Sequence, residues 1–304
     1  MSRAAVFDYS LVAILTLLWG SAFVLIEIAL PAFSPAMIAL LRIAMAAAFM
    51  IAFSVYKGIG LPRTRAHWAK CTSLGLFGFA LPFTLVSYGQ EFVNSATAAI
   101  LMAFSPIATL VLAHFLTADE KMTQRRLAAV CLGFLGIIIL FGGALNVQTM
   151  GIGGLALLGA AFSYAVAGLV MKSMYQFSDI QSSTGSLMMA ALWSVPALGL
   201  RGDFAKLPYI FQADTSALLS IAAMAIGPTG LATILVLIIV RRRGATFSAT
   251  SNYGVPVVGV LLGAALLGDP LRWNILVTLL LILTAIWLAR PAAENMPAET
   301  VSAE

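Results

Sequence analysis

The stretch SATAAILMAFSPIATLVLAHFLTADE, residues 95–120, aligns without a gap with ATFSATSNYGVPVVGVLLGAALLGDP, residues 245–270. In this register Pro106 falls on Pro256, and each proline lies inside an apolar run. A proline within a helix removes one backbone donor and frees a carbonyl about one turn earlier. Both stretches therefore predict helices that are interrupted at the same position.

A second pair of prolines supports an internal repeat. The segment GFALP, residues 78–82, matches GPTG, residues 227–230, so that Pro82 lies near Pro228 in the alignment. Two proline matches in the same order, each deep in an apolar run, are hard to attribute to chance. We therefore expect hinge or gating positions at four prolines, namely Pro82, Pro106, Pro228 and Pro256.

The composition places the chain in a membrane. Of its 304 residues, 61% are hydrophobic and only 10% are charged, with a mean hydropathy of +1.00, whereas about a quarter of the residues of a soluble domain are charged. Apolar runs of about 20 residues, each long enough to cross a bilayer, follow one another closely. We predict an all-α polytopic membrane protein with ten transmembrane helices, at about 9–30, 34–56, 68–90, 95–116, 124–143, 151–174, 180–200, 215–240, 245–268 and 271–290.

The basic residues lie mainly on one side of this arrangement. With a cytoplasmic N-terminus, the opposite side receives only Arg201, Lys206 and Arg272. This asymmetry follows the positive-inside rule, so we expect a multi-pass protein of the bacterial inner membrane with both termini in the cytoplasm. The RRR run at 241–243 is then an anchor in the anionic leaflet. The basic residues form no sustained stripe, which argues against nucleic-acid binding.

The number of predicted helices implies an inverted repeat. Five helices fall in residues 1–145 and five in 146–290, followed by a tail, 291–304, that we expect to be disordered. Because five is odd, the second half enters the membrane upside down. Consistently, Asp119 falls in a cytoplasmic loop and its match Asp269 in an external one. Such repeats around a central cavity are typical of secondary transporters.

Two deep aromatic residues are candidates for the wall of that cavity. Aligning helix 1 with helix 6 places Trp19 opposite Tyr164, far from the interfaces where such residues usually lie. A buried indole N–H or phenol O–H needs a partner, which a solute, water or a neighbouring helix can supply. We favour the cavity for both residues, and core packing for Trp193. The small residue Gly20 predicts close helix contact beside the large ring.

A polar run inside the ninth span is the second candidate region. FSATSNYG, residues 247–254, precedes Pro256 and offers polar groups in a membrane segment. These side chains could bind a polar head group, or could bond to their own helix and to neighbouring helices. The predicted solute-binding residues are Trp19, Tyr88, Phe104, Tyr164, Ser251, Asn252 and Tyr253. For Tyr88, an interfacial anchor is an equal alternative to a gate.

Few ionisable residues lie within the spans, and these are usually functional. Glu27 lies near the external end of helix 1, and Arg42 lies in helix 2, which returns from that side. A structural ion pair between them, proton coupling and solute contact all remain open. A mostly neutral cavity with deep aromatic residues favours a small zwitterion with an apolar side chain over a dication or a phosphate ester.

The same segments resemble a known family. WGSAF (19–23), LR (41–42) and the repeated order of small residues, proline and a following acidic residue are similar to the two EamA-type repeats of the drug/metabolite transporter superfamily. The resemblance extends over about residues 9–290 and implies a basket of helices around a cavity that opens alternately to each side. By size and pattern it fits the ten-helix exporters of amino acids and other metabolites, including aromatic amino acids. Asp269 departs from the glutamate that is frequent in this family.

We therefore expect a transporter that exports small amphipathic metabolites, most readily amino acids with aromatic or other apolar side chains, and that functions as a monomer. The alternatives are an exporter of drugs or lipophilic cations, and a scaffold or receptor that transports nothing. We expect neither enzymatic activity, nor a cofactor, nor a bound metal, because no catalytic motif is present and His67 and His114 have no obvious ligand partners.

Overall fold

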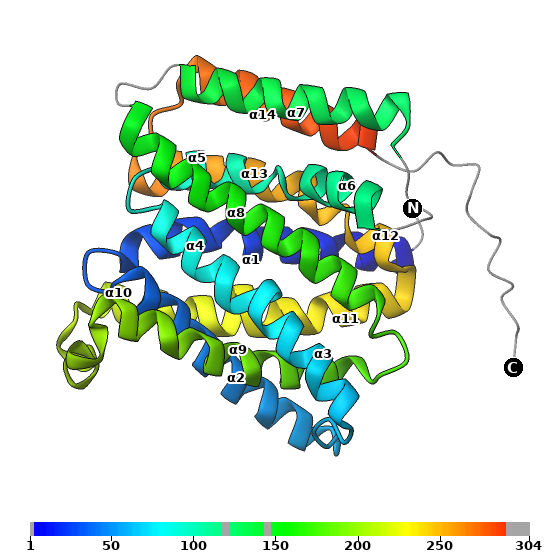
Figure 1. The fold of residues 1–304 in the computed structure, drawn as a ribbon, viewed down its shortest axis with the longest axis vertical. Helices are drawn as coiled ribbons and strands as arrows, with labels where there is room; N and C mark the ends of the chain where they lie inside the picture. Colours follow the sequence, from blue (N-terminus) through cyan, green and yellow to red (C-terminus); the bar gives the residue numbers. More distant parts are fainter. Residues whose placement is uncertain (1–2, 117–121, 143–146, 290–304) are drawn as a thin grey trace, which may run out of the picture.

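The computed structural model describes residues 3–116, 122–142 and 147–289, and within these ranges the regular structure is entirely helical. The helices lie side by side and run between two faces of the molecule (Figure 1). We call the face at which α1 begins the N-terminal face, and the opposite one, which carries η2, the η2 face. The predictions for Asp119 and for the tail 291–304 concern residues outside the described ranges.

The first half of the chain contains α1 to α7. Their bounds are Arg3–Ala29 (α1), Pro35–Tyr56 (α2), Arg65–Gly75 (α3), Leu76–Ala80 (the π-helical η1), Leu81–Gly89 (α4), Ser95–Met102 (α5), Ser105–Leu116 (α6) and Gln124–Gly142 (α7).

The second half contains α8 to α14. Their bounds are Val147–Lys172 (α8), Asp179–Arg201 (α9), Asp203–Gln212 (the 3₁₀-helical η2), Thr215–Met224 (α10), Ala225–Leu231 (the π-helical η3), Ala232–Arg243 (α11), Ala245–Ser248 (α12), Ser251–Leu262 (α13), Gly263–Leu267 (the π-helical η4) and Trp273–Ala289 (α14).

These elements agree with the predicted crossings. Within the described residues, seven helices or continuous helix series are long and apolar enough to span a membrane. The helix α7 and the shorter apolar helices Ser251–Leu267 and Trp273–Ala289 lie at the remaining predicted positions. The prediction of an all-α polytopic membrane protein is therefore confirmed.

The two halves pack with inverted orientations. α1 begins at the N-terminal face and packs along α13, whereas α8 begins at the η2 face and packs along α5 and α6. Equivalent helices also pair across the halves, with α7 along α14, α2 along α9 and α5 along α13 (Figure 1). Helices of each half therefore pack directly against helices of the other half.

Three of the four matched prolines lie at or beside irregular helix segments, and the fourth, Pro256, lies inside α13. η1 ends just before Pro82, and Pro228 lies inside η3, so the third span of each half contains a π-helical segment. The fourth spans are also broken, between α5 and α6 just before Pro106 and between α12 and α13 a few residues before Pro256. The third spans are thus irregular beside Pro82 and Pro228, because a proline removes the donor that would continue a regular helix. In the fourth spans the breaks do not coincide in the alignment, since Pro256 lies inside α13, and a hinge or gating role for the four prolines stays a prediction.

Small residues bring α1 against α13. A Cβ atom on Gly20 would lie 2.5 Å from Cγ1 of Val258, and one on Gly254 would lie 2.5 Å from Cγ2 of Thr16. These backbones approach too closely for a side chain, as in other membrane helix pairs packed through small residues. The close contact predicted for Gly20 is confirmed.

Candidate functional site

A single arginine lies buried between the interrupted helices. Arg42 in α2 is only 6% exposed. Its guanidinium Cζ lies 3.8 Å from the ring centroid of Phe83 in α4, and its Nε donates to Oγ1 of Thr229 in η3 at 2.7 Å. Tyr164 in α8 packs against the same cluster of buried side chains that contains Phe83. Arg42 therefore lies where α2, α4, α8 and η3 meet.

The interruption at Pro228 explains how Thr229 holds the arginine. Pro228 has no N–H, so it cannot donate to the carbonyl of Met224 four residues earlier. The hydroxyl of Thr229 donates to that carbonyl at 2.9 Å. Because its proton is used there, the same oxygen offers a lone pair to Nε of Arg42. The broken helix thus fixes both the hydroxyl and the guanidinium.

The surroundings of Arg42 are apolar and aromatic. A cluster of buried residues from α2, α4 and α9 includes Ile43, Phe83 and Leu187. Several larger side chains pack against this cluster while part of their surface stays accessible, namely Phe49, Phe53, Phe79, Tyr164 and Ile234. Arg42 is therefore a buried cation that forms no ion pair with the residues that the structure describes, and such charges are rare in membrane spans unless they meet a partner.

The ion pair considered for Glu27 and Arg42 is not formed. Among the described residues, no carboxylate lies within ion-pair distance of Arg42. Glu27 instead accepts a hydrogen bond from the backbone N–H of Ser95 at 2.7 Å. That N–H lies in the first turn of α5, where a carboxylate is favoured by the helix dipole. The pairing hypothesis was wrong because the α5 N-terminus offers Glu27 a nearer partner.

The terminal nitrogens of Arg42, Nη1 and Nη2, have no hydrogen-bond partner among the described residues. The fully occluded side-chain polar atoms that lack a partner there are Oε1 of Gln90, Oγ1 of Thr184 and Oγ of Ser186. The two terminal nitrogens of Arg42 are not among them, so neither is fully occluded.

Three predicted solute-binding residues keep a polar group without a partner. Trp19, Tyr164 and Asn252 are partly buried, and among the described residues none of their side-chain polar atoms makes a hydrogen bond or is fully occluded. Trp19 packs against α11 and Phe247. Their position is compatible with a cavity wall, and contact with a solute stays a prediction for all three.

Three other candidates are used for packing. Phe104 is 1% exposed and lies edge-on against Phe134 and Phe162, so a solute cannot reach it in this conformation. Ser251 is fully buried and donates back to the carbonyl of Ser248. The hydroxyl of Tyr253 donates to the carbonyl of Ile286 in α14 at 3.1 Å. In this conformation, hydrogen bonds occupy the hydroxyls of Ser251 and Tyr253, and aromatic rings pack against Phe104, so solute contact at these positions stays a prediction.

Tyr88 and Trp193 are the two remaining aromatic residues for which we made a prediction from the sequence. Tyr88 stacks edge-on with Phe92 and lies beneath the guanidinium of Arg201, 5.7 Å from its Cζ, at the η2 face. This position fits both a gate and an interfacial anchor. Trp193 is 42% exposed on α9, so the expectation of core packing for it was wrong.

The triple arginine joins helices at the N-terminal face. Arg242 and Arg243 contact Asp8 of α1, with N–O distances of 2.8 and 3.7 Å, and Arg241 contacts Asp179 of α9 at 3.2 Å. Asp8 is buried, whereas Asp179 is exposed. An anchor in the lipid leaflet was therefore an incomplete interpretation, because the run ties the end of α11 to α1 and α9.

Asp269 has a structural role that the sequence did not reveal. Its Oδ2 accepts from Oγ of Ser95 at 2.7 Å and from the backbone N–H of Ala96 at 3.0 Å. Asp269 and Glu27 therefore both accept hydrogen bonds from the first turn of α5. Asp269 links the second half of the chain to α5, and Glu27 links α1 to α5. In the sequence, this role was indicated only by the recurrence of an acidic residue after each proline-containing helix.

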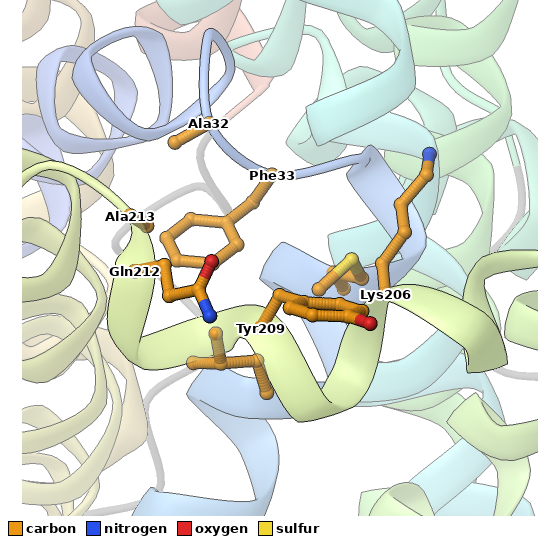
Figure 2. A pocket seen from close by; sticks show the side chains of 8 residues that line it. Ala32, Phe33, Lys206, Tyr209, Gln212 and Ala213 are labelled. Carbon is orange, nitrogen blue, oxygen red and sulfur yellow. The ribbon is translucent and has the colours of Figure 1, made fainter.

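A hollow of about 300 Å³ opens at the η2 face. Figure 2 shows the ring of Phe33 next to Gln212 and Ala213, and the ring of Tyr209 beside Lys206. The amine of Lys206 pairs with the buried Asp203 at 2.9 Å, and the hydroxyl of Ser34 also donates to that carboxylate. Burial alone would raise the pKa of Asp203, but these two hydrogen bonds and the charges of Lys206 and Arg201 lower it below its ordinary value.

Inverted halves, paired helix interruptions and a buried polar group between them are the features of a membrane transporter. The EamA-like transporter family model matches the chain twice, at residues 7–142 and 151–290, and the chain belongs to this family. The two matches agree with the repeat that the prolines revealed.

Relatives of similar length support this membership. The chain is 25% identical to the "Probable amino-acid metabolite efflux pump" of Salmonella typhimurium over 287 residues, which cover 92% of this chain and 94% of that pump. It is also 25% identical to the "Uncharacterized transporter YoaV" of Bacillus subtilis over 278 residues, covering 90% and 93% of the two chains. A solved crystal structure with 19% identity covers 95% of this chain and 97% of its own, with a TM-score of 0.64, and shows the same fold.

Proposed function

We propose that this transporter exports small amphipathic metabolites, above all amino acids with aromatic or other apolar side chains, by alternating access. The observation that carries the proposal is the set of polar groups without a protein partner at Trp19, Tyr164 and Asn252, deep among otherwise apolar spans. In a bilayer, such groups are costly unless water or a solute reaches them. A mostly apolar, aromatic environment that contains the buried cation Arg42 suits a zwitterion whose side chain is apolar.

Relatives support the substrate class and the direction. Proteins named "Probable amino-acid metabolite efflux pump" in Salmonella typhimurium and Escherichia coli align with over nine-tenths of this chain. We further propose a location in the bacterial inner membrane with the N-terminal face toward the cytoplasm, because most basic residues lie on that side. The packing of each half against the other is compatible with a functional monomer.

Counterflow in proteoliposomes tests this function. Vesicles containing the purified protein are loaded with an unlabelled amino acid, and uptake of the labelled one is followed for phenylalanine, leucine and lysine. We expect transient accumulation of phenylalanine and leucine above the level of protein-free vesicles. Trp19→Ala and Asn252→Ala should reduce it severalfold, whereas Trp193→Ala, an exposed tryptophan of α9, should not.

Two results would oppose the proposal. Normal transport by Trp19→Ala and Asn252→Ala at every substrate concentration would remove these residues from the solute path. Complete absence of amino-acid counterflow, with accumulation of a lipophilic cation instead, would favour a drug exporter, and no counterflow of any solute would favour a scaffold.

A further inference from the structure

The guanidinium of Arg42 presents one free edge. Of its five N–H groups, the one on Nε is donated to Thr229, and one face of the plane is covered by the ring of Phe83. The remaining four belong to Nη1 and Nη2, which have no partner among the described residues. Nη1 and Nη2 form a planar fork that matches the two oxygens of a carboxylate.

A buried guanidinium inside a membrane span is costly unless a counter-charge meets Nη1 and Nη2 of Arg42. An arginine that is 6% exposed has lost nearly all of its contact with solvent. Glu27 on α1 is used by the first turn of α5, and no acid among the described residues forms an ion pair with Arg42. A buried charge without a counter-charge is strongly destabilising, so an anion that reaches Arg42 would relieve this cost and offset part of its own desolvation.

We infer that the free edge of Arg42 binds the carboxylate of the transported solute, while the apolar part of the solute lies among the partly exposed residues around it, such as Phe79, Tyr164 and Ile234. This inference rests on the proposed transport function. It deepens it by naming the recognised chemical class, which is a monocarboxylate attached to an apolar or aromatic group.

A carboxylate site at Arg42 would select between classes of solute. No acidic side chain among the described residues stands beside Arg42 to receive the ammonium group of an amino acid. The amino group therefore contributes less than the carboxylate, and an aromatic acid without an amine should bind. The positive charge of Arg42 also disfavours lipophilic cations, which have no counter-charge there.

Ligand-dependent thermal stability of the purified full chain in detergent tests this directly. The probes are 3-phenylpropionate and the nearly isosteric neutral 3-phenylpropionamide. For the natural sequence we expect the acid to raise the unfolding temperature, with a half-saturating concentration at least about tenfold below that of the amide. Arg42→Gln should lose this preference, and Arg42→Lys should retain part of it. Arg272→Gln, which alters an exposed arginine in the segment before α14, should leave it unchanged.

Equal responses to acid and amide in the natural sequence, no response to either, or an undiminished preference for the acid in Arg42→Gln would overturn the inference. If Arg42→Gln does not fold, the natural sequence and Arg42→Lys still decide it. Counterflow separates this inference from the proposed function. Acid-selective binding without amino-acid counterflow would support the carboxylate site and oppose the transport function. Amino-acid counterflow that is inhibited equally by acid and amide would support the transport function and oppose the carboxylate site.

Discussion

Phe83 and Thr229, which directly follow the matched prolines Pro82 and Pro228 of the two halves, contact the same guanidinium. The ring centroid of Phe83 lies 3.8 Å from Cζ of Arg42, and Oγ1 of Thr229 lies 2.7 Å from its Nε. The two interrupted spans therefore meet at Arg42, with one half supplying an aromatic face and the other a hydrogen-bond acceptor. This shared contact places the candidate site at the interface between the repeats.

Thr229→Val should weaken solute binding. The substitution keeps the shape of the side chain but removes the acceptor for Nε of Arg42 and the donor for the Met224 carbonyl. We expect the half-saturating concentration for counterflow to rise about fivefold to tenfold, and the free energy of unfolding to fall by about 1–3 kcal/mol. The matched control is Thr233→Val, whose hydroxyl bonds only to the carbonyl of Thr229. Equal kinetics of the two variants would argue against a positioning role for Thr229.

Gly20→Ala should destabilise the contact between α1 and α13. The new Cβ would lie 2.5 Å from Cγ1 and 2.7 Å from Cβ of Val258, so the helices would have to separate. Overpacking of this kind costs about 1–3 kcal/mol. Gly168→Ala is the control, because a Cβ there meets nothing within 4 Å. Thermal unfolding in detergent should show a lower midpoint for the first variant only, and unchanged midpoints for both would contradict the packing argument.

Asp8→Asn should loosen the N-terminal face more than Asp179→Asn does. Asp8 is buried and bonds to Arg242 at 2.8 Å, whereas the contact between Asp179 and Arg241 is exposed. A hydrogen bond between charged groups contributes about 1.5–3 kcal/mol, and an exposed ion pair contributes less than about 1 kcal/mol. The difference should appear as a lower unfolding midpoint and as faster proteolysis at this face for Asp8→Asn. Identical behaviour of the two variants would show that the buried pair has no special role.

Asp203 should make stability depend on pH on the acidic side. Its pKa in the folded protein is lowered, because bonds from Ser34 and Lys206 and nearby positive charge outweigh the opposing effect of burial. A carboxyl with a lowered folded-state pKa contributes stability above its unfolded pKa, and this contribution is lost as the pH falls through the folded value. The unfolding midpoint should therefore fall more between pH 6 and about 3 in the natural sequence than in Asp203→Asn. Parallel curves would rule out this contribution.

The sequence predicted the fold through features that act locally. Prolines and hydrophobic runs determine where helices cross and where they break, and both are readable without tertiary contacts. The interruptions at η1 and η3 and the close approach at Gly20 were therefore predictable. The seven spans and the shorter apolar helices follow from the same pattern.

The sequence was less informative about which polar groups meet. Glu27 and Arg42 lie near each other along the predicted helices, but Glu27 bonds to the first turn of α5 and Arg42 to Thr229. The rotation of each helix about its own axis determines which polar side chains face each other. The hydropathy of the sequence does not specify this rotation. For the same reason Phe104 and Tyr253 face neighbouring helices, although their depth suggested a cavity.

Transport of phenylalanine by the unaltered protein is the most direct test of the central claim. Proteoliposomes loaded with unlabelled phenylalanine are supplied with labelled phenylalanine, and a parallel set is loaded and supplied with tetraphenylphosphonium. If the protein carries carboxylate-bearing amphipathic metabolites, the vesicles should transiently contain more labelled phenylalanine than protein-free vesicles do, which is called an overshoot. Labelled tetraphenylphosphonium should show no overshoot. An overshoot for tetraphenylphosphonium without one for phenylalanine would contradict this account.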